Sequence, residues 1–147
     1  VRTYHAGDSL ILLTGLRGRL KLQTIPHSPV GYAVESGLLH EDEAMTHEER
    51  HIIDNALGSP DLRIEIGPAV ELARFDTLLL ASDGLADNLT TGEIVECVRK
   101  GPLDAAAARL LDGCRRRMEQ PEEGAPSKPD DLSFVLYRLD RRAPTAP

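Results

Sequence analysis

The chain has 147 residues, of which 41% are hydrophobic and 28% are charged; this fits one domain with a buried core and excludes wholesale disorder. Its 24 acidic and 17 basic residues give a net charge of −7, which argues against nucleic-acid or anionic-membrane binding because both need clustered positive charge. No apolar run approaches the ~20 residues that cross a bilayer, so we expect a cytoplasmic protein without membrane or nucleic-acid partners.

The first 25 residues are predicted to form three short strands connected by tight turns. Residues 1–6, 10–14 and 19–25 carry the apolar runs or the alternation of apolar and polar side chains that strands require. Residues 7–9 and 15–18 supply the glycines and polar residues that turns need. This pattern is typical of a β-meander.

Residues 28–60 are polar and favour short helices. One or two helical turns are expected over 30–36, and the capping box of residues 46–49 predicts a helix that continues to about Leu57. Residues 62–66 alternate again and predict a further strand.

The last third alternates between strands and helices. Residues 77–81 are continuously apolar and predict a strand that is buried on both faces, whereas 132–139 predict a second interior strand. A capping box at Thr90 opens a helix to Lys100, and an apolar stripe predicts a helix over 103–118. We therefore expect an α+β domain in which both faces of the sheet are covered, followed by a tail.

Acidic residues stand where the predicted strands end or begin. Asp8 follows the first strand, Asp83 follows the strand over 77–81 with Asp87 four residues later, and Asp130 precedes the last strand. A single aspartate in a turn often only accepts backbone hydrogen bonds. In an antiparallel sheet, however, the end of one strand lies beside the start of its neighbour, so we expect the Asp83 and Asp130 carboxylates within ~6 Å, close enough to share a hard cation such as magnesium or manganese.

Five sequence motifs occur in an order that resembles a known enzyme family. They are Ala6-Gly7-Asp8-Ser9, Ile25-Pro26-His27-Ser28-Pro29, Glu35-Ser36-Gly37-Leu38-Leu39, Ser82-Asp83-Gly84-Leu85-Ala86-Asp87 and Asp130-Asp131-Leu132-Ser133-Phe134-Val135. In order and spacing they resemble the C-terminal half of the metal-dependent protein phosphatase 2C family. The resemblance implies a β-sandwich flanked by helices, and an enzyme that hydrolyses phosphoserine and phosphothreonine at a binuclear magnesium or manganese centre.

The resemblance also assigns metal ligands by position. Asp83 would be a ligand of one core metal, and Asp130 would match the aspartate of the closing Asp-Asn motif, where Asp131 stands in place of the asparagine. Asp8 and Asp87, together with Asp83, would hold a third and weaker metal. No residue beyond these ligands is expected to act in catalysis.

The same resemblance describes the chain as a whole. Residues 1–139 would be the C-terminal part of a phosphatase 2C-like domain, with 28–60 as a flap beside the substrate groove and 140–147 as a tail. A phosphoprotein would be the substrate, and an upstream kinase or sensor is a candidate partner. The family's Asp-Gly-x-Gly motif, whose aspartate bridges the two core metals, is absent from the sequence, so we expect an N-terminally truncated chain with little activity of its own.

Two alternatives compete with this interpretation. A degenerate phosphatase-like module would bind phosphoproteins or partners without turnover. More remotely, residues 47–51 fit the zinc-protease pattern H-E-x-x-H, in which two histidines share one helix face and the glutamate acts as general base. The charged Glu49 and Arg50 between the histidines favour instead a capped helix exposed to solvent.

Overall fold

The computed structural model describes residues 1–139, so the predicted tail over 140–147 lies outside the described residues. The strands are β1 (Tyr4–His5), β2 (Leu10–Thr14), β3 (Leu20–Gln23), β4 (Glu65–Ile66), β5 (Thr77–Ala81) and β6 (Phe134–Arg138). The helices are α1 (Pro29–Glu35), α2 (Glu41–Ala44), the 3₁₀ helix η1 (Glu48–His51), α3 (Asp83–Ala86), α4 (Thr91–Val98) and α5 (Leu103–Glu119). The predicted α+β class is confirmed.

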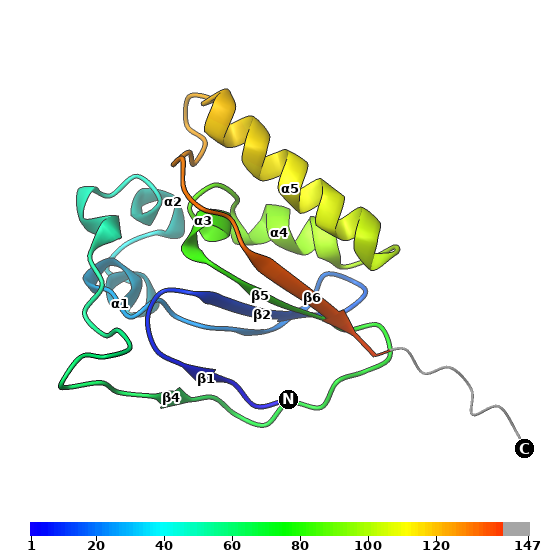
Figure 1. The fold of residues 1–147 in the computed structure, drawn as a ribbon, viewed down its shortest axis with the longest axis horizontal. Coiled ribbons are helices and arrows are strands. Elements are labelled where there is room, and N and C mark those ends of the chain that lie inside the picture. The colour runs from blue at the N-terminus through cyan, green and yellow to red at the C-terminus, as the bar shows by residue number, and fades with distance from the viewer. Residues whose placement is uncertain (140–147) are drawn as a thin grey trace, which may run out of the picture.

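An antiparallel sheet in the order β3-β2-β5-β6 forms the centre of the molecule (Figure 1). The predicted strands over 10–14 and 77–81 are found with the same bounds, because each is a short apolar run between turn residues. Leu12 pairs with Leu79, and Leu79 pairs in turn with Leu136 on β6. A separate two-stranded sheet joins β1 to β4, with Tyr4 opposite Ile66.

Helices α3, α4 and α5 cover one face of this sheet and enclose the main core (Figure 1). The predicted capping box at Thr90 is confirmed, since its hydroxyl accepts the Glu93 N–H and its own N–H donates to the Glu93 carboxylate. On α5 the fully buried residues are Ala106, Leu110 and Cys114. Among residues 1–139, none of the helices combines the length and the apolar character that crossing a bilayer requires.

The opposite face of the sheet is partly open, which corrects the expectation that both faces are covered. Leu80 on β5 is 42% exposed, and Val135 and Tyr137 on β6 are 62% and 46% exposed. The expected interior strand over 132–139 is an edge strand of the described sheet, because β6 pairs only with β5. The apolar runs predicted burial on both faces, but on β5 the structure buries Thr77, Leu79 and Ala81 and exposes Leu80, and on β6 no side chain is fully buried.

The polar segment over 28–60 differs from its prediction. Helix α1 forms as expected, but the capping box at 46–49 does not, because the Thr46 hydroxyl donates back to the Glu43 carbonyl (3.2 Å) and closes α2. The chain then makes only the short helix η1, whose N-cap is His47. The backbone becomes extended at Ile52, and the Asp54 N–H donates to the His27 carbonyl (3.0 Å) instead of continuing a helix toward Leu57. The Asn55 side chain then pairs with the backbone N–H and carbonyl of Arg63 (3.0 and 2.7 Å).

Candidate metal centre

The junction of β5 and β6 brings three aspartates together. Ala81 pairs with Phe134, and the Ser82 N–H donates to the Ser133 carbonyl (2.9 Å), so Asp83 leaves the sheet beside the segment that carries Asp130. One carboxylate oxygen each of Asp83, Asp87 and Asp130 lies within 4.8 Å of the others. This distance satisfies the expectation for Asp83 and Asp130 and adds Asp87, the C-cap of α3, which lies one helical turn after Asp83.

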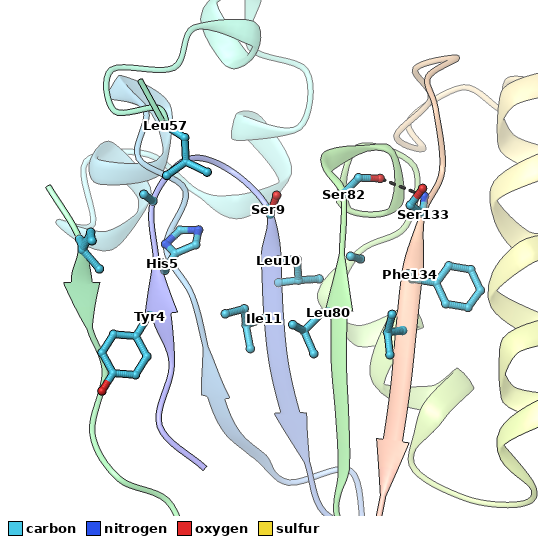
Figure 2. Close-up of a pocket in the computed structure, with 14 residues that line it drawn as sticks. Tyr4, His5, Ser9, Leu10, Ile11, Leu57, Leu80, Ser82, Ser133 and Phe134 are labelled. Atoms are coloured by element: carbon cyan, nitrogen blue, oxygen red, sulfur yellow. Dashed lines mark hydrogen bonds between the residues drawn. The ribbon is translucent and has the colours of Figure 1, made fainter. Parts of the chain in front are cut away.

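Small and polar residues bring these two segments into close contact. Gly84 has no room for a side chain, because a Cβ there would lie 2.4 Å from the Asp131 carbonyl oxygen. The Ser82 hydroxyl donates to that carbonyl (3.1 Å) and accepts the Ser133 N–H (3.1 Å), a bond that Figure 2 shows. The motif Ser-Asp-Gly therefore positions Asp83 through both of its neighbours.

Asn88 is a positioning residue that the sequence interpretation missed. It is fully buried, and its Nδ2 donates to the carbonyls of Gly84 (2.9 Å) and Lys128 (2.7 Å). Its Oδ1 accepts the Lys128 N–H (2.9 Å), so one side chain fastens α3 to the loop before Asp130. In the sequence it is only an asparagine five residues after Asp83, and it belongs to no recognisable motif.

Lys128 is a second residue that was missed, and it is the cation of the cluster. Its Nζ lies 2.5 Å from Asp87 Oδ2, 3.3 Å from Asp130 Oδ2 and 3.7 Å from Asp83 Oδ2. Burial and then the charges of Asp8 and Asp130 raise the pKa of Asp83, whereas the Asp131 N–H and the Lys128 ammonium lower the pKa of Asp130.

Asp83 and Asp87 of the cluster, but not Asp130, line a cavity of about 470 Å³ to which the segment over 28–60 also contributes. Asp83 and Asp87 contribute one wall, and Val34, Met45 and Ile53 contribute to the other. Residues of the segment therefore line the same cavity as Asp83 and Asp87, and its assignment as a flap stays a prediction.

Asp8 lies apart from the three-residue cluster. It lines the same cavity, and its charge is among the causes that raise the pKa of Asp83, but the group within 4.8 Å contains only Asp83, Asp87 and Asp130. The donor set is therefore composed of carboxylate oxygens, which fits a hard cation such as Mg²⁺ or Mn²⁺ better than Zn²⁺.

Comparison with known proteins relates the chain to a family. No family model matches the chain. A putative protein phosphatase 2C-type of Streptococcus pyogenes is 34% identical over 114 residues, which are 74% of this chain and 44% of that protein. The Mycobacterium tuberculosis serine/threonine phosphatase PstP/Ppp superposes on 95% of this chain and 55% of its own, with a TM-score of 0.72 and 27% identity. The chain belongs to the protein phosphatase 2C family.

The phosphatase 2C relatives are longer than this chain. The chain spans about half the length of the relatives it matches. A structure of the catalytic domain of PstP in complex with two manganese ions matches 92% of this chain and 51% of its own, with a TM-score of 0.67 and 28% identity.

The H-E-x-x-H pattern gains no support from the structure of this phosphatase 2C chain. His47 is the N-cap of η1, where its Nδ1 accepts the Glu49 N–H (3.1 Å), and His51 is exposed. In a 3₁₀ helix with three residues per turn, positions i and i+4 do not share a face. Among residues 1–139, neither histidine belongs to a group of three potential metal ligands.

A second cluster that the sequence did not suggest joins β1 to β4. His5, His27 and Glu65 place one ligand-type atom each within 4.8 Å of the others. The Nδ1 of His27 accepts hydrogen bonds from the Gly7 N–H (3.2 Å) and the Asn55 amide (2.6 Å), and its Nε2 lies 3.1 Å from Glu65 Oε2. We therefore assign the neutral tautomer in which Nε2–H donates to Glu65.

His5 lies at the edge of a second cavity, of about 610 Å³, on the open face of the sheet. Ile11, Leu80 and Leu57 line the same space (Figure 2). His5 is buried, and among the described residues neither of its ring nitrogens has a hydrogen-bond partner. Its ring centroid lies 4.6 Å from that of His27.

Proposed function

We propose that the chain contributes the Asp83–Asp130 part of a metal-dependent serine/threonine phosphatase site. The supporting observation is the meeting of three carboxylates within 4.8 Å, two of which, Asp83 and Asp87, line a cavity of about 470 Å³. The protein phosphatase 2C relatives support Mg²⁺ or Mn²⁺ as the cation and a phosphoprotein as the substrate.

The roles of the residues follow from their positions. Asp83 and Asp130 would hold a core ion, because they project from two segments that Gly84 and Ser82 keep in contact. Asp87 lies within reach of that same ion, and Asp8 and Asp87, together with Asp83, would also hold a more weakly bound ion at the edge of the site. A bound divalent cation supplies a water of lowered pKa and neutralises phosphate charge. The chain's own residues orient that cation and present it to the cavity.

The site needs carboxylates that this chain does not supply. A two-metal site holds its ions ~3.5–4 Å apart with a shared ligand, and the sequence has no Asp-Gly-x-Gly motif for that purpose. The open sheet face at Leu80 and Val135 supports the same conclusion, because an apolar face of this kind is normally covered. We therefore propose that a complementary half-domain packs on this face, in a cytoplasmic protein whose substrates are supplied by an upstream kinase.

A reconstitution experiment tests the proposed function. The 147-residue chain is assayed with p-nitrophenyl phosphate and a phosphothreonine peptide, alone and mixed with the complementary half of the streptococcal relative, with manganese titrated and EDTA as the control. We expect little turnover by the chain alone and manganese-dependent turnover by the mixture. In the mixture, Asp83→Asn should lower kcat more than it raises KM, since the ligand acts on transition-state charge.

The open face supplies the matched control. Leu80→Lys places a charge on the surface proposed to be covered and leaves the carboxylates intact, so it should prevent association of the halves while manganese binding by the chain persists. Rapid, EDTA-insensitive turnover by the chain alone would contradict the two-metal mechanism.

A further inference from the structure

Lys128 lies between the proposed metal ligands, and its backbone is fixed there. Its N–H and its carbonyl are both bonded to the buried side chain of Asn88 (2.9 and 2.7 Å), and Pro129 follows directly. The backbone position therefore does not depend on the ammonium. From this position the side chain extends into the acidic cluster rather than into solvent, and about a quarter of it is exposed (27%).

The ammonium contacts the same oxygens that a divalent cation would use. Nζ lies 2.5 Å from Asp87, 3.3 Å from Asp130 and 3.7 Å from Asp83. A single exposed ion pair contributes little, but here one ammonium is shared among three carboxylates, of which those of Asp83 and Asp87 are partly buried and that of Asp130 belongs to an exposed residue. Such a network holds the ammonium more firmly than one isolated pair would. A divalent ion can bind these oxygens only after the ammonium has moved away.

We propose that Lys128 is a tethered cation that competes with the divalent metal for Asp83, Asp87 and Asp130 and thereby sets the metal affinity of the site. The inference rests on the proposed function, because it takes these three carboxylates as the metal ligands. The bound ammonium neutralises one of three negative charges, so the three aspartates keep their positions when no metal is bound. The divalent ion then occupies the site only when its concentration is high. Turnover in a reconstituted enzyme would then follow the available manganese or magnesium.

Three lysine variants of the full 147-residue chain test this inference by calorimetric titration with Mn²⁺. Lys128→Gln removes the charge but keeps a side chain of similar length, Lys128→Arg keeps the charge, and Lys100→Gln removes the same charge from an exposed lysine at the end of α4. We expect Lys128→Gln to bind Mn²⁺ at least about fivefold more tightly than the wild-type chain, and the other two to stay within about twofold of it.

The possible outcomes separate this inference from the proposed function. Equal Mn²⁺ affinity of wild-type chain and Lys128→Gln would overturn the competition but leave the metal site standing. If Lys100→Gln raised the Mn²⁺ affinity as much as Lys128→Gln does, the gain would come from the change in net charge alone, and the competition would also be overturned. Absence of Mn²⁺ binding by every variant would overturn both. Because Lys128→Gln could unfold, circular dichroism accompanies the titration and Lys128→Met serves as a second neutral variant with the same expected tightening.

Discussion

Two groups of side chains in the described residues place three potential metal ligands within 4.8 Å, and they differ in what already occupies those ligand atoms. In the group of His5, His27 and Glu65, the Nδ1 lone pair of His27 accepts two hydrogen bonds and its Nε2–H donates to the carboxylate. In the group of Asp83, Asp87 and Asp130, the shared cationic partner is the Lys128 ammonium.

This difference supports the proposal that the aspartate cluster, rather than the histidine cluster, holds the metal. The histidine cluster satisfies His27 with internal partners, so a metal there would have to displace a proton and break the bond to Glu65. The aspartate cluster brings negative charges close together. Burial and the charges of the neighbouring aspartates disfavour the ionised form of Asp83 and therefore raise its pKa. A cation therefore stabilises the second cluster and would disturb the first.

Removal of a ligand from the aspartate cluster should have the largest effect. Asp83→Asn and Asp130→Asn each take one charged oxygen donor from the proposed site, and we expect the Mn²⁺ affinity to fall by about 100-fold or more. Calorimetric titration measures this, with exposed His51→Ala as the unaffected control. Unchanged affinity in both aspartate variants would place the ion elsewhere.

Disturbance of the contact between the two segments should have the next largest effect. Gly84→Ala places a Cβ 2.4 Å from the Asp131 carbonyl oxygen, so the segments must separate. We expect the unfolding free energy to fall by about 1–3 kcal/mol and Mn²⁺ binding to weaken with it. Gly92→Ala is the matched control, since the nearest neighbouring atom to its Cβ would be Thr90 Oγ1 at 4.0 Å. A Gly84→Ala protein as stable as Gly92→Ala would contradict the packing argument.

Disruption of the histidine cluster should affect folding but not Mn²⁺ binding. His27→Ala leaves the Gly7 N–H and one contact of the Asn55 amide without a partner, so the unfolding free energy should fall by about 1–3 kcal/mol. Urea denaturation measures this loss, and titration with Mn²⁺ should give nearly the wild-type affinity. Loss of Mn²⁺ binding in a folded His27→Ala protein would reverse the assignment of the two clusters.

The smallest expected effect is the pH dependence that His5 confers on stability. Burial, followed by the charge of His27, lowers the pKa of His5, while the Ser9 backbone and the charges of Glu65 and Asp8 raise it. The unfolded chain therefore binds this proton at higher pH than the folded chain, and stability should fall as the pH drops through about 6.5. In His5→Gln, thermal unfolding between pH 7.5 and 5.5 should show a weaker dependence; an identical slope would exclude His5 as its source.

The sequence predicted the sheet centre and the carboxylate edge better than the segment between them. The strands over 10–14 and 77–81 and the cap at Thr90 depend on local patterns, and antiparallel pairing then brings Asp83 near Asp130. The prediction for the segment over 46–57 was wrong because the Thr46 hydroxyl bonds back to the Glu43 carbonyl instead of capping a new helix, and the Asn55 side chain bonds to the backbone of Arg63.

Residues that act through tertiary contacts left no local pattern to recognise. Asn88 and Lys128 are 40 positions apart, and their mutual hydrogen bonds exist only after β5 and β6 have paired. The open face at Leu80 was likewise invisible, because an apolar strand has the same sequence whether its second face is covered or exposed.

The location of a bound manganese ion tests the central claim most directly. Crystals of the 147-residue chain grown with MnCl₂ would show the ion by its anomalous scattering at the manganese absorption edge. We predict a peak among the carboxylates of Asp83, Asp87 and Asp130, with the Lys128 ammonium displaced from them. A peak between His5 and Glu65, or a peak absent from the aspartate cluster at saturating manganese, would contradict the assignment of the metal site.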